Sequence, residues 1–302
     1  MRVKRGKTLN RVRRVQIVEV ALRDGLQSVR EFVPTEEKLA LVRRLINAGV
    51  RRIEATAFVS PRWVPQMSDA EQLMARVPRG GGTEYMALVV NERGYQRALA
   101  ARVDWLCYVV AATEAISRSN ANMSLREALE LARRVIAQAK KDGLRVRGSI
   151  GVAWVCPYEG EVPAARTLDI AAELILAGAD EISFNDTTGK ATPERTYALF
   201  AEARGRWPHL SFAAHLHDTT GMALDNIKAA MKAGVAVFDA AVGGLGGCPF
   251  TPGAPGNVAT ERVVAMLEEL GVETDIDLRT LREIARDYAS WMLHPSSSRS
   301  KG

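Results

Sequence analysis

Two histidines separated by one residue are the clearest candidates for chemistry in this chain of 302 residues. They end the apolar run Ala213-Ala214-His215-Leu216-His217, which predicts a β-strand. Side chains alternate along a strand, so His215 and His217 point to the same side. The chain has only four histidines, and two imidazoles that converge at a strand end are typical of metal ligands. We therefore interpret the pair as ligands of a metal ion.

Charged residues stand at the ends of three other predicted strands. Asp24 offers a hard oxygen ligand, and Arg23 offers a permanent cation suited to an oxyanion or enolate; an ordinary surface salt bridge is the alternative. Glu54 interrupts an apolar strand, and because a buried carboxylate needs a cation or a metal, we expect it to face Arg23. Asp186 adds a carboxylate at the same rim, with a turn-capping role as its alternative.

The segment 242–257 has an unusual composition. It contains six glycines and three prolines around Cys248, which predicts a mobile lid. Cys248 could donate or accept a proton when the lid closes, and Asn257 could bind a metal or cap the following helix. No Gly-Lys-Ser/Thr follows the glycines, so phosphate binding of the Walker type is not indicated. Cys107, by contrast, falls within a predicted strand and is expected to be buried and inert.

These residues share one site only if the chain alternates strands and helices. Apolar runs predict strands at 15–20, 52–56, 84–89, 105–111, 145–152, 181–185, 211–217 and 237–241. Amphipathic segments predict helices at 35–48, 69–76, 92–101, 125–142, 163–177, 193–206, 222–233 and 257–270. Eight such units without a dividing linker predict an α/β fold, a single (β/α)₈ TIM barrel, over two doubly wound halves. In a TIM barrel, the C-terminal ends of the strands carry the chemistry, and a short helical extension is expected at 278–293.

Positive charge is concentrated at the N-terminus. Residues 1–14 carry seven lysines and arginines and no acid, so a net charge of +6 leaves the remaining chain at −1. We expect a basic flexible arm at 1–14, a barrel domain at 15–293 and a disordered tail at 294–302. A nearly neutral body argues against a nucleic-acid partner, although a polyanion-binding protein that uses the arm is the non-enzyme alternative. No run of about 18 apolar residues is present to span a membrane.

The number and spacing of the cysteines indicate the redox state of the cellular compartment. Cys107, Cys156 and Cys248 are too few and too scattered for a disulfide framework or a structural zinc cluster. We therefore expect a reducing compartment and a cytoplasmic protein.

Several segments together resemble the hydroxymethylglutaryl-CoA lyase family of metal-dependent TIM-barrel lyases and synthases. The matching segments are 23–27, 53–67, 156–160, 215–219, 244–250 and 256–257. The resemblance implies an acyl-CoA substrate and a homodimer. It also implies four ligands of a divalent cation, Mg²⁺ or Mn²⁺: Asp24, His215, His217 and Asn257.

The resemblance further implies a retro-Claisen cleavage of 3-hydroxy-3-methylglutaryl-CoA to acetyl-CoA and acetoacetate, as in leucine degradation and ketone-body formation. Arg23 would stabilise the enolate and Glu54 would orient Arg23, while Asp186 would support the site. The base would be Asp24 or a nearby histidine. The acid that protonates the enolate would be Cys248 or His215.

Four positions depart from the family pattern. Ser28 and Val29 replace the usual Asn-Glu, Ser149 stands where a tyrosine is usual, and Asn185 replaces a glycine. Ser149 would enlarge the pocket, so a bulkier 3-hydroxy-3-alkylglutaryl thioester is an alternative substrate. A Claisen condensing synthase of the isopropylmalate or homocitrate type is the second alternative. Those synthases lack the Gly-Gly-Cys-Pro loop and carry C-terminal extensions, whereas this chain has the loop and only about 30 residues after its last barrel helix.

Overall fold

The computed structural model describes residues 12–248 and 251–289. Most of the predicted arm, the predicted tail and the end of the predicted extension lie outside these residues. The last arm residues are described, and they pair with the chain beyond the final barrel helix. The amide of Glu273 donates to the carbonyl of Arg13, the amide of Val15 donates to the carbonyl of Glu273, and Arg14 forms an ion pair with Asp275. The described contacts of the barrel domain therefore include Arg13 and Arg14.

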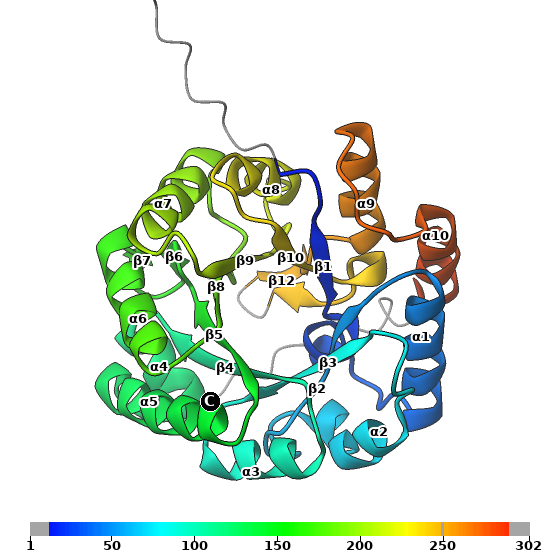
Figure 1. Cartoon of the computed structure of the whole chain (residues 1–302), viewed down its shortest axis with the longest axis horizontal. Coiled ribbons are helices and arrows are strands. Elements are labelled where there is room, and N and C mark those ends of the chain that lie inside the picture. The colour runs from blue at the N-terminus through cyan, green and yellow to red at the C-terminus, as the bar shows by residue number, and fades with distance from the viewer. Residues whose placement is uncertain (1–11, 249–250, 290–302) are drawn as a thin grey trace, which may run out of the picture.

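Eight parallel strands form a closed barrel in the order β1-β10-β9-β8-β5-β4-β3-β2, which confirms the predicted fold (Figure 1). The strands are β1 (Gln16–Glu19), β2 (Arg52–Ala57), β3 (Glu84–Val89), β4 (Trp105–Ala111), β5 (Arg145–Gly151), β8 (Glu181–Asp186), β9 (Ser211–Leu216) and β10 (Val237–Ala240). Each lies where an apolar run predicts it, because strands buried on both faces read as continuous apolar segments.

Helices surround the barrel, as the amphipathic segments predict. They are α1 (Thr35–Asn47), α2 (Ala70–Arg76), α3 (Glu92–Ala100), α5 (Leu125–Lys141), α6 (Ala164–Leu176), α7 (Pro193–Arg206), α8 (Ala223–Lys232) and α9 (Thr260–Glu269). The extension forms α10 (Leu278–Asp287), which contacts α1 and α9. Within the described ranges, no helix is both long enough and apolar enough to cross a membrane.

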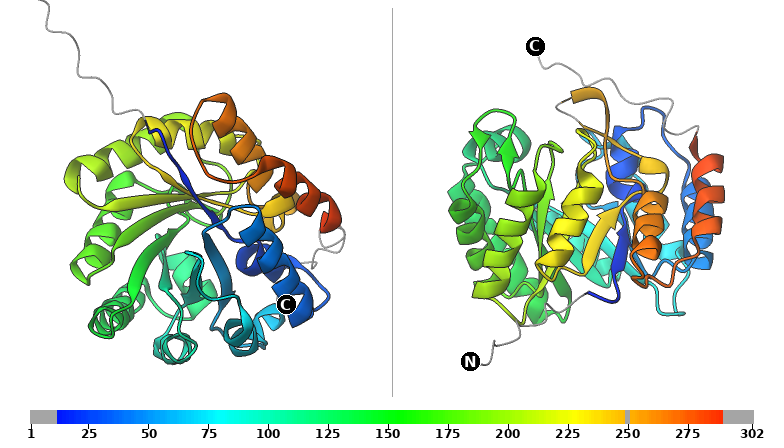
Figure 2. Two further views of the ribbon diagram at one scale, coloured as in Figure 1. Left: turned by 45° about the vertical axis from the view of Figure 1, so that its right-hand side comes forward. Right: turned by 90° about the horizontal axis from the view of Figure 1, so that it is seen from above.

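Three short elements were not predicted. They are helix α4 (Glu114–Ala121) and the hairpin formed by β6 (Val155–Cys156) and β7 (Gly160–Glu161). Strands of two residues carry no periodic pattern, and α4 has only one buried apolar side chain, Ile116, so it shows no apolar stripe. The loop after β10 is also more regular than its composition indicates, because β11 (Gly247–Cys248) pairs antiparallel with β12 (Thr251–Pro255). Figure 2 shows this hairpin at the end of the barrel opposite the start of β1.

The last barrel helix begins later than predicted. Helix α9 starts at Thr260 and its N-terminal flanking residue is Ala259, so Asn257 neither opens nor caps the helix. Asn257 instead forms an antiparallel bridge with His217, and Ala259 forms a parallel bridge with Ala241. Residues 257–259 thus extend the ladder at the ends of the barrel strands, which places Asn257 at the barrel mouth.

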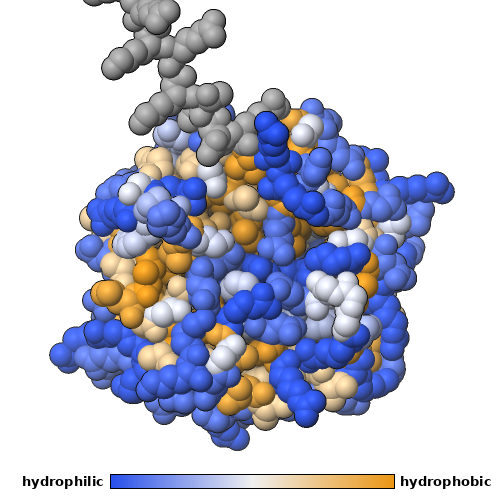
Figure 3. Space-filling view, viewed as in Figure 1, coloured by the Kyte–Doolittle hydropathy of each residue, from blue (hydrophilic) through white to orange (hydrophobic). Residues whose placement is uncertain are grey.

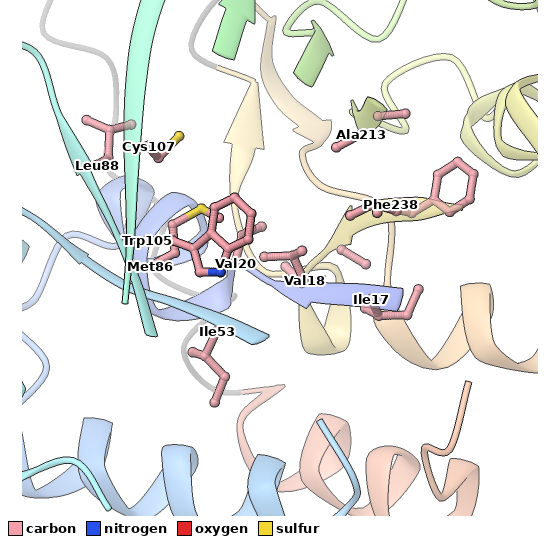
Figure 4. Packing of buried hydrophobic residues seen from close by; sticks show 14 of the residues in the cluster. Ile17, Val18, Val20, Ile53, Met86, Leu88, Trp105, Cys107, Ala213 and Phe238 are labelled. Atoms are coloured by element: carbon pink, nitrogen blue, oxygen red, sulfur yellow. The ribbon is translucent and has the colours of Figure 1, made fainter. Parts of the chain in front are cut away.

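Apolar packing fills only part of the barrel interior. Figure 4 shows Met86 and Trp105 packed together among the buried strands, and these two residues are paired in register between β3 and β4. The Arg52 guanidinium lies 4.1 Å from the centre of the Trp105 ring and also pairs with Glu84 at 3.1 Å. Viewed along the barrel axis, Figure 3 shows a largely hydrophilic surface with smaller hydrophobic patches.

A buried carboxylate ties the end of β1 to the loop after β10. One oxygen of Glu19 accepts hydrogen bonds from the amides of Ala21 and Val242, and the other accepts from the Thr260 hydroxyl at 2.7 Å. Glu19 is fully buried, and this burial raises its pKa from 4.5 to about 7 despite the three donors. The folded state therefore favours the protonated carboxyl, which can itself donate to the Thr260 hydroxyl.

This pKa predicts a pH-dependent stability. Because the folded carboxyl binds its proton more tightly than the unfolded one, the free energy of unfolding falls as pH rises from 4.5 towards 7. The variant Glu19→Gln does not titrate and keeps the hydrogen-bond pattern, so it lacks this loss, which amounts to about 3 kcal/mol. Urea denaturation at pH 5 and pH 7.5 measures the difference between variant and wild type. The exposed Glu269→Gln is the control, and equal pH dependence of all three proteins would contradict the assignment.

Candidate active site

Arg23 and Asp24 stand on a wide helical turn that follows β1. Residues Ala21–Gly25 form a π-helix in which the amides of Arg23, Asp24 and Gly25 all donate to the carbonyl of Val20. Such π-turns are uncommon and are concentrated at functional sites. Both charged side chains are buried, with 9% and 7% of their residue surface exposed. The turn therefore buries two adjacent charged side chains at the barrel mouth.

Glu54 contacts Arg23, as the sequence predicts. Arg23 Nε donates to Glu54 Oε2 at 2.6 Å, and Arg23 Nη1 donates to Asp24 Oδ1 at 2.6 Å. The pairing of β2 with β3 shifts in register between Glu54 and Thr56, an irregularity of the kind that redirects a side chain. Burial raises the pKa of Glu54, and Arg23 offsets part of that rise. One guanidinium is thus held between two carboxylates.

His215, His217 and Asp24 converge at one point. The two imidazole Nε2 atoms lie 3.8 Å and 3.6 Å from Asp24 Oδ2, and the ring centres are 5.2 Å apart. One donor atom from each residue lies within 4.8 Å of the other two, which makes these three the only such His/Cys/Asp/Glu group among the described residues. Two imidazoles and a carboxylate fit a divalent cation with open positions. His215 lies in β9, His217 directly follows β9, and Asp24 lies on the turn after β1.

Asp24 is held in its charged form. Burial alone would raise the pKa of Asp24, but the Arg23 guanidinium and the two histidines outweigh burial and hold the pKa well below its usual range. Gln27 Nε2 also donates to Asp24 Oδ1 at 2.9 Å. The carboxylate is therefore available as an anionic ligand at neutral pH.

Asn257 reaches the same carboxylate from the loop after β10. Its Nδ2 donates to Asp24 Oδ2 at 2.8 Å and to the carbonyl of Leu245 at 3.1 Å. Gly246 has φ of +129°, and a Cβ at this position would lie 2.8 Å from Asn257 Nδ2, so only glycine allows the loop to pass this closely. The side chain proposed as the fourth ligand thus lies against Asp24.

Asp186 and Cys107 do not belong to the cluster of Asp24, His215 and His217. Asp186 is buried and accepts from the amides of Lys190 and Ala191 at 3.1 Å and 2.9 Å, so it shapes the turn after β8, and its own carbonyl accepts from the His217 amide. Cys248 lies in β11, but its side chain falls outside the described part of the structure. Cys107 is buried, as expected, and burial raises its pKa, which makes it a poor nucleophile.

The sequence did not identify three buried charged residues inside the barrel, Asp239, Arg147 and Glu181, of which Asp239 contacts His215. Asp239 Oδ2 lies 3.2 Å from His215 Nδ1, and Asp239 Oδ1 accepts from Arg147 Nη1 at 2.7 Å. Arg147 also pairs with Glu181 at 2.7 Å. A carboxylate on one imidazole nitrogen fixes the ring and directs the other nitrogen towards a metal. Each of these three residues is a charged residue within a predicted apolar strand. The same pattern identified Glu54, so it could have identified them too.

Comparisons with known proteins place the chain in a family. The HMGL-like family model matches residues 14–287. The chain is 40% identical to the hydroxymethylglutaryl-CoA lyase of Pseudomonas mevalonii over 270 residues, which covers 89% of this chain and 90% of that protein.

Solved structures agree with this match. HMG-CoA lyase from Brucella melitensis superposes with a TM-score of 0.89 at 44% identity, covering 93% of this chain and 99% of that one. HMG-CoA lyase from Acinetobacter baumannii, solved with coenzyme A and 3-methylmalate, gives a TM-score of 0.88 at 33% identity, covering 95% and 93%. The chain belongs to the HMGL-like family, which confirms the resemblance seen in the sequence, and it is a lyase.

The Asp239–His215 contact predicts a measurable effect on metal binding. The variant Asp239→Asn keeps the shape of the side chain but weakens the contact with the imidazole, so we expect Mn²⁺ affinity to fall about tenfold to a hundredfold by isothermal titration calorimetry. Glu181→Gln is the matched control, because it also removes a carboxylate from Arg147 without touching His215. If both variants lose affinity equally, the effect comes from Arg147, and the role of Asp239 is wrong.

Proposed function

We propose that this protein cleaves 3-hydroxy-3-methylglutaryl-CoA to acetyl-CoA and acetoacetate with the help of a divalent cation. The observation that carries the proposal is the convergence of Asp24, His215 and His217 beside Arg23 at the mouth of the barrel. Relatives that share this barrel along most of its length are named for the same cleavage. A condensing synthase is disfavoured, because relatives and solved structures that match this chain over most of its length are named as lyases.

The metal would be held by Asp24, His215 and His217, with Asn257 as the fourth side chain at the same point. Mg²⁺ and Mn²⁺ suit this mixture of oxygen and imidazole donors. When bound, the cation lowers the pKa of the substrate hydroxyl and makes its proton easier to remove. Asp24 or His217 accepts that proton.

Arg23 would meet the charge that develops when the carbon–carbon bond breaks. Its guanidinium is fixed by Glu54 and Asp24 before substrate arrives, so no reorganisation is needed as the enolate forms. His215 is committed to Asp239 through one nitrogen and faces Asp24 with the other. We therefore assign protonation of the enolate carbon to Cys248, delivered from the hairpin, and assign Asp186 to shaping the neighbouring turn.

The family resemblance also indicates the native ion, the substrate class, the oligomeric state and the location. We expect Mg²⁺ or Mn²⁺ as the native ion, an acyl-CoA substrate, a homodimer and a cytoplasmic location, since the three cysteines favour a reducing compartment. The bulkier 3-alkyl substrate is not favoured by the geometry. Ser149 is buried, and its Oγ accepts from Asn185 Nδ2 at 2.9 Å, so a neighbouring side chain already packs against this position.

Asp24→Asn tests the central cluster. Loss of the negative ligand and of one partner of Arg23 should lower kcat about a hundredfold or more, measured as acetoacetate released from 3-hydroxy-3-methylglutaryl-CoA with Mg²⁺. Asp180→Asn is the control, because Asp180 pairs with Lys140 near the start of β8. Full activity of Asp24→Asn, or no acetoacetate from the wild type, would overturn the proposal.

Cys248→Ala tests the proton donor. If Cys248 protonates the enolate, kcat should fall about 10²- to 10⁴-fold while Mn²⁺ affinity stays unchanged. Cys107→Ala is the control at a buried cysteine that the reaction does not use. Wild-type kcat in Cys248→Ala would transfer the assignment to another group.

A further inference from the structure

Three polar side chains line one side of the barrel mouth on β5 and β8. Asn185 Nδ2 donates to Ser149 Oγ at 2.9 Å, and Ser183 Oγ donates to Asn185 Oδ1 at 2.8 Å. Ser149 and Ser183 are fully buried, whereas Asn185 is partly exposed. The two serines thus hold one amide at the edge of the site, where a ligand can reach it.

Strand register places this amide beside a metal ligand. Asn185 pairs with His215 between β8 and β9, and Ser149 pairs with Ser183 between β5 and β8. Residues paired in a parallel register point to the same side of the sheet. Since His215 faces the barrel interior, Asn185 does so too, in the same layer of side chains.

The amide orientation leaves a donor for substrate. Asn185 Oδ1 accepts from Ser183 Oγ at 2.8 Å and from Ser149 Oγ at 3.2 Å, and Nδ2 donates one hydrogen bond within the described residues, to Ser149 Oγ. The second hydrogen on Nδ2 is therefore available. An amide is also neutral, so it adds a donor without adding a negative charge next to Asp24 and Asp186.

We propose that Asn185 binds the free carboxylate of the substrate through this second hydrogen. The inference rests on the proposed function, because it assumes an acyl chain that ends in a carboxylate near the metal ligands. A carboxylate has more acceptor sites than one cation can satisfy, and a fixed N–H donor in the His215 layer satisfies another. Where the family usually has glycine at this position, no side chain could make this contact. Asn185 would therefore favour a substrate that ends in a carboxylate.

A substrate swap tests the contact. We compare 3-hydroxy-3-methylglutaryl-CoA with the analogue in which the free carboxylate is a carboxamide, using wild type and Asn185→Asp. The wild type should prefer the carboxylate. The aspartate repels a carboxylate but accepts from a carboxamide, so the ratio of kcat/KM for the two substrates should shift at least about tenfold towards the carboxamide. Dissociation constants from calorimetry with Mn²⁺-loaded protein should shift in the same direction, and this binding readout does not depend on turnover.

Two controls separate this inference from its premises. Ser183→Ala removes a partner of Asn185 without creating a charge, so it should weaken binding of the carboxylate substrate without reversing the preference. Direct Mn²⁺ titration of Asn185→Asp shows whether the new charge acts on the metal instead. An unchanged substrate ratio in Asn185→Asp, with acetoacetate still released by the wild type, overturns the role of Asn185 alone. Absence of acetoacetate from the wild type overturns the proposed function. The ratio of the calorimetric dissociation constants for the carboxylate and the carboxamide then decides the role of Asn185.

Discussion

The active site depends on one buried carboxylate. Asp24 receives hydrogen bonds from Arg23, Gln27 and Asn257, and two histidines face it within 3.8 Å. These groups come from the turn after β1, from β9 and its end, and from the loop after β10, so the charge can be held only when the barrel is closed. Burying an isolated carboxylate would cost several kcal/mol, which makes the assembled cluster a condition of the fold as well as of the chemistry.

The barrel interior contains ion pairs as well as aliphatic side chains. Arg147 joins Glu181 to Asp239, and Asp239 reaches His215, so the floor of the barrel connects to its mouth through direct contacts. This series of polar contacts fixes the orientation of the His215 ring more tightly than apolar packing does, because each member has a directional partner. The interior thereby orients the groups at the mouth before a substrate binds.

Sequence patterns predicted what depends on local periodicity. The strands, the barrel and the His215/His217 pair all followed from alternation and spacing, and the contact of Glu54 with Arg23 followed from the cost of a buried charge. Contacts set by the order of strands in space were not available from the sequence. Asp239 lies next to His215 only because β10 neighbours β9 in the barrel. Asn257 contacts Asp24 only because residue 257 forms a bridge with His217 instead of starting a helix.

Asp24, His215 and His217 are proposed to form one divalent-cation site. The most direct measurement is anomalous diffraction at the manganese edge from crystals of the wild-type protein grown with Mn²⁺. If they do, a single strong peak will lie about 2.0–2.3 Å from one carboxylate oxygen of Asp24 and one nitrogen of each histidine. A peak bound elsewhere, or no peak at this cluster under saturating Mn²⁺, would contradict the proposed site.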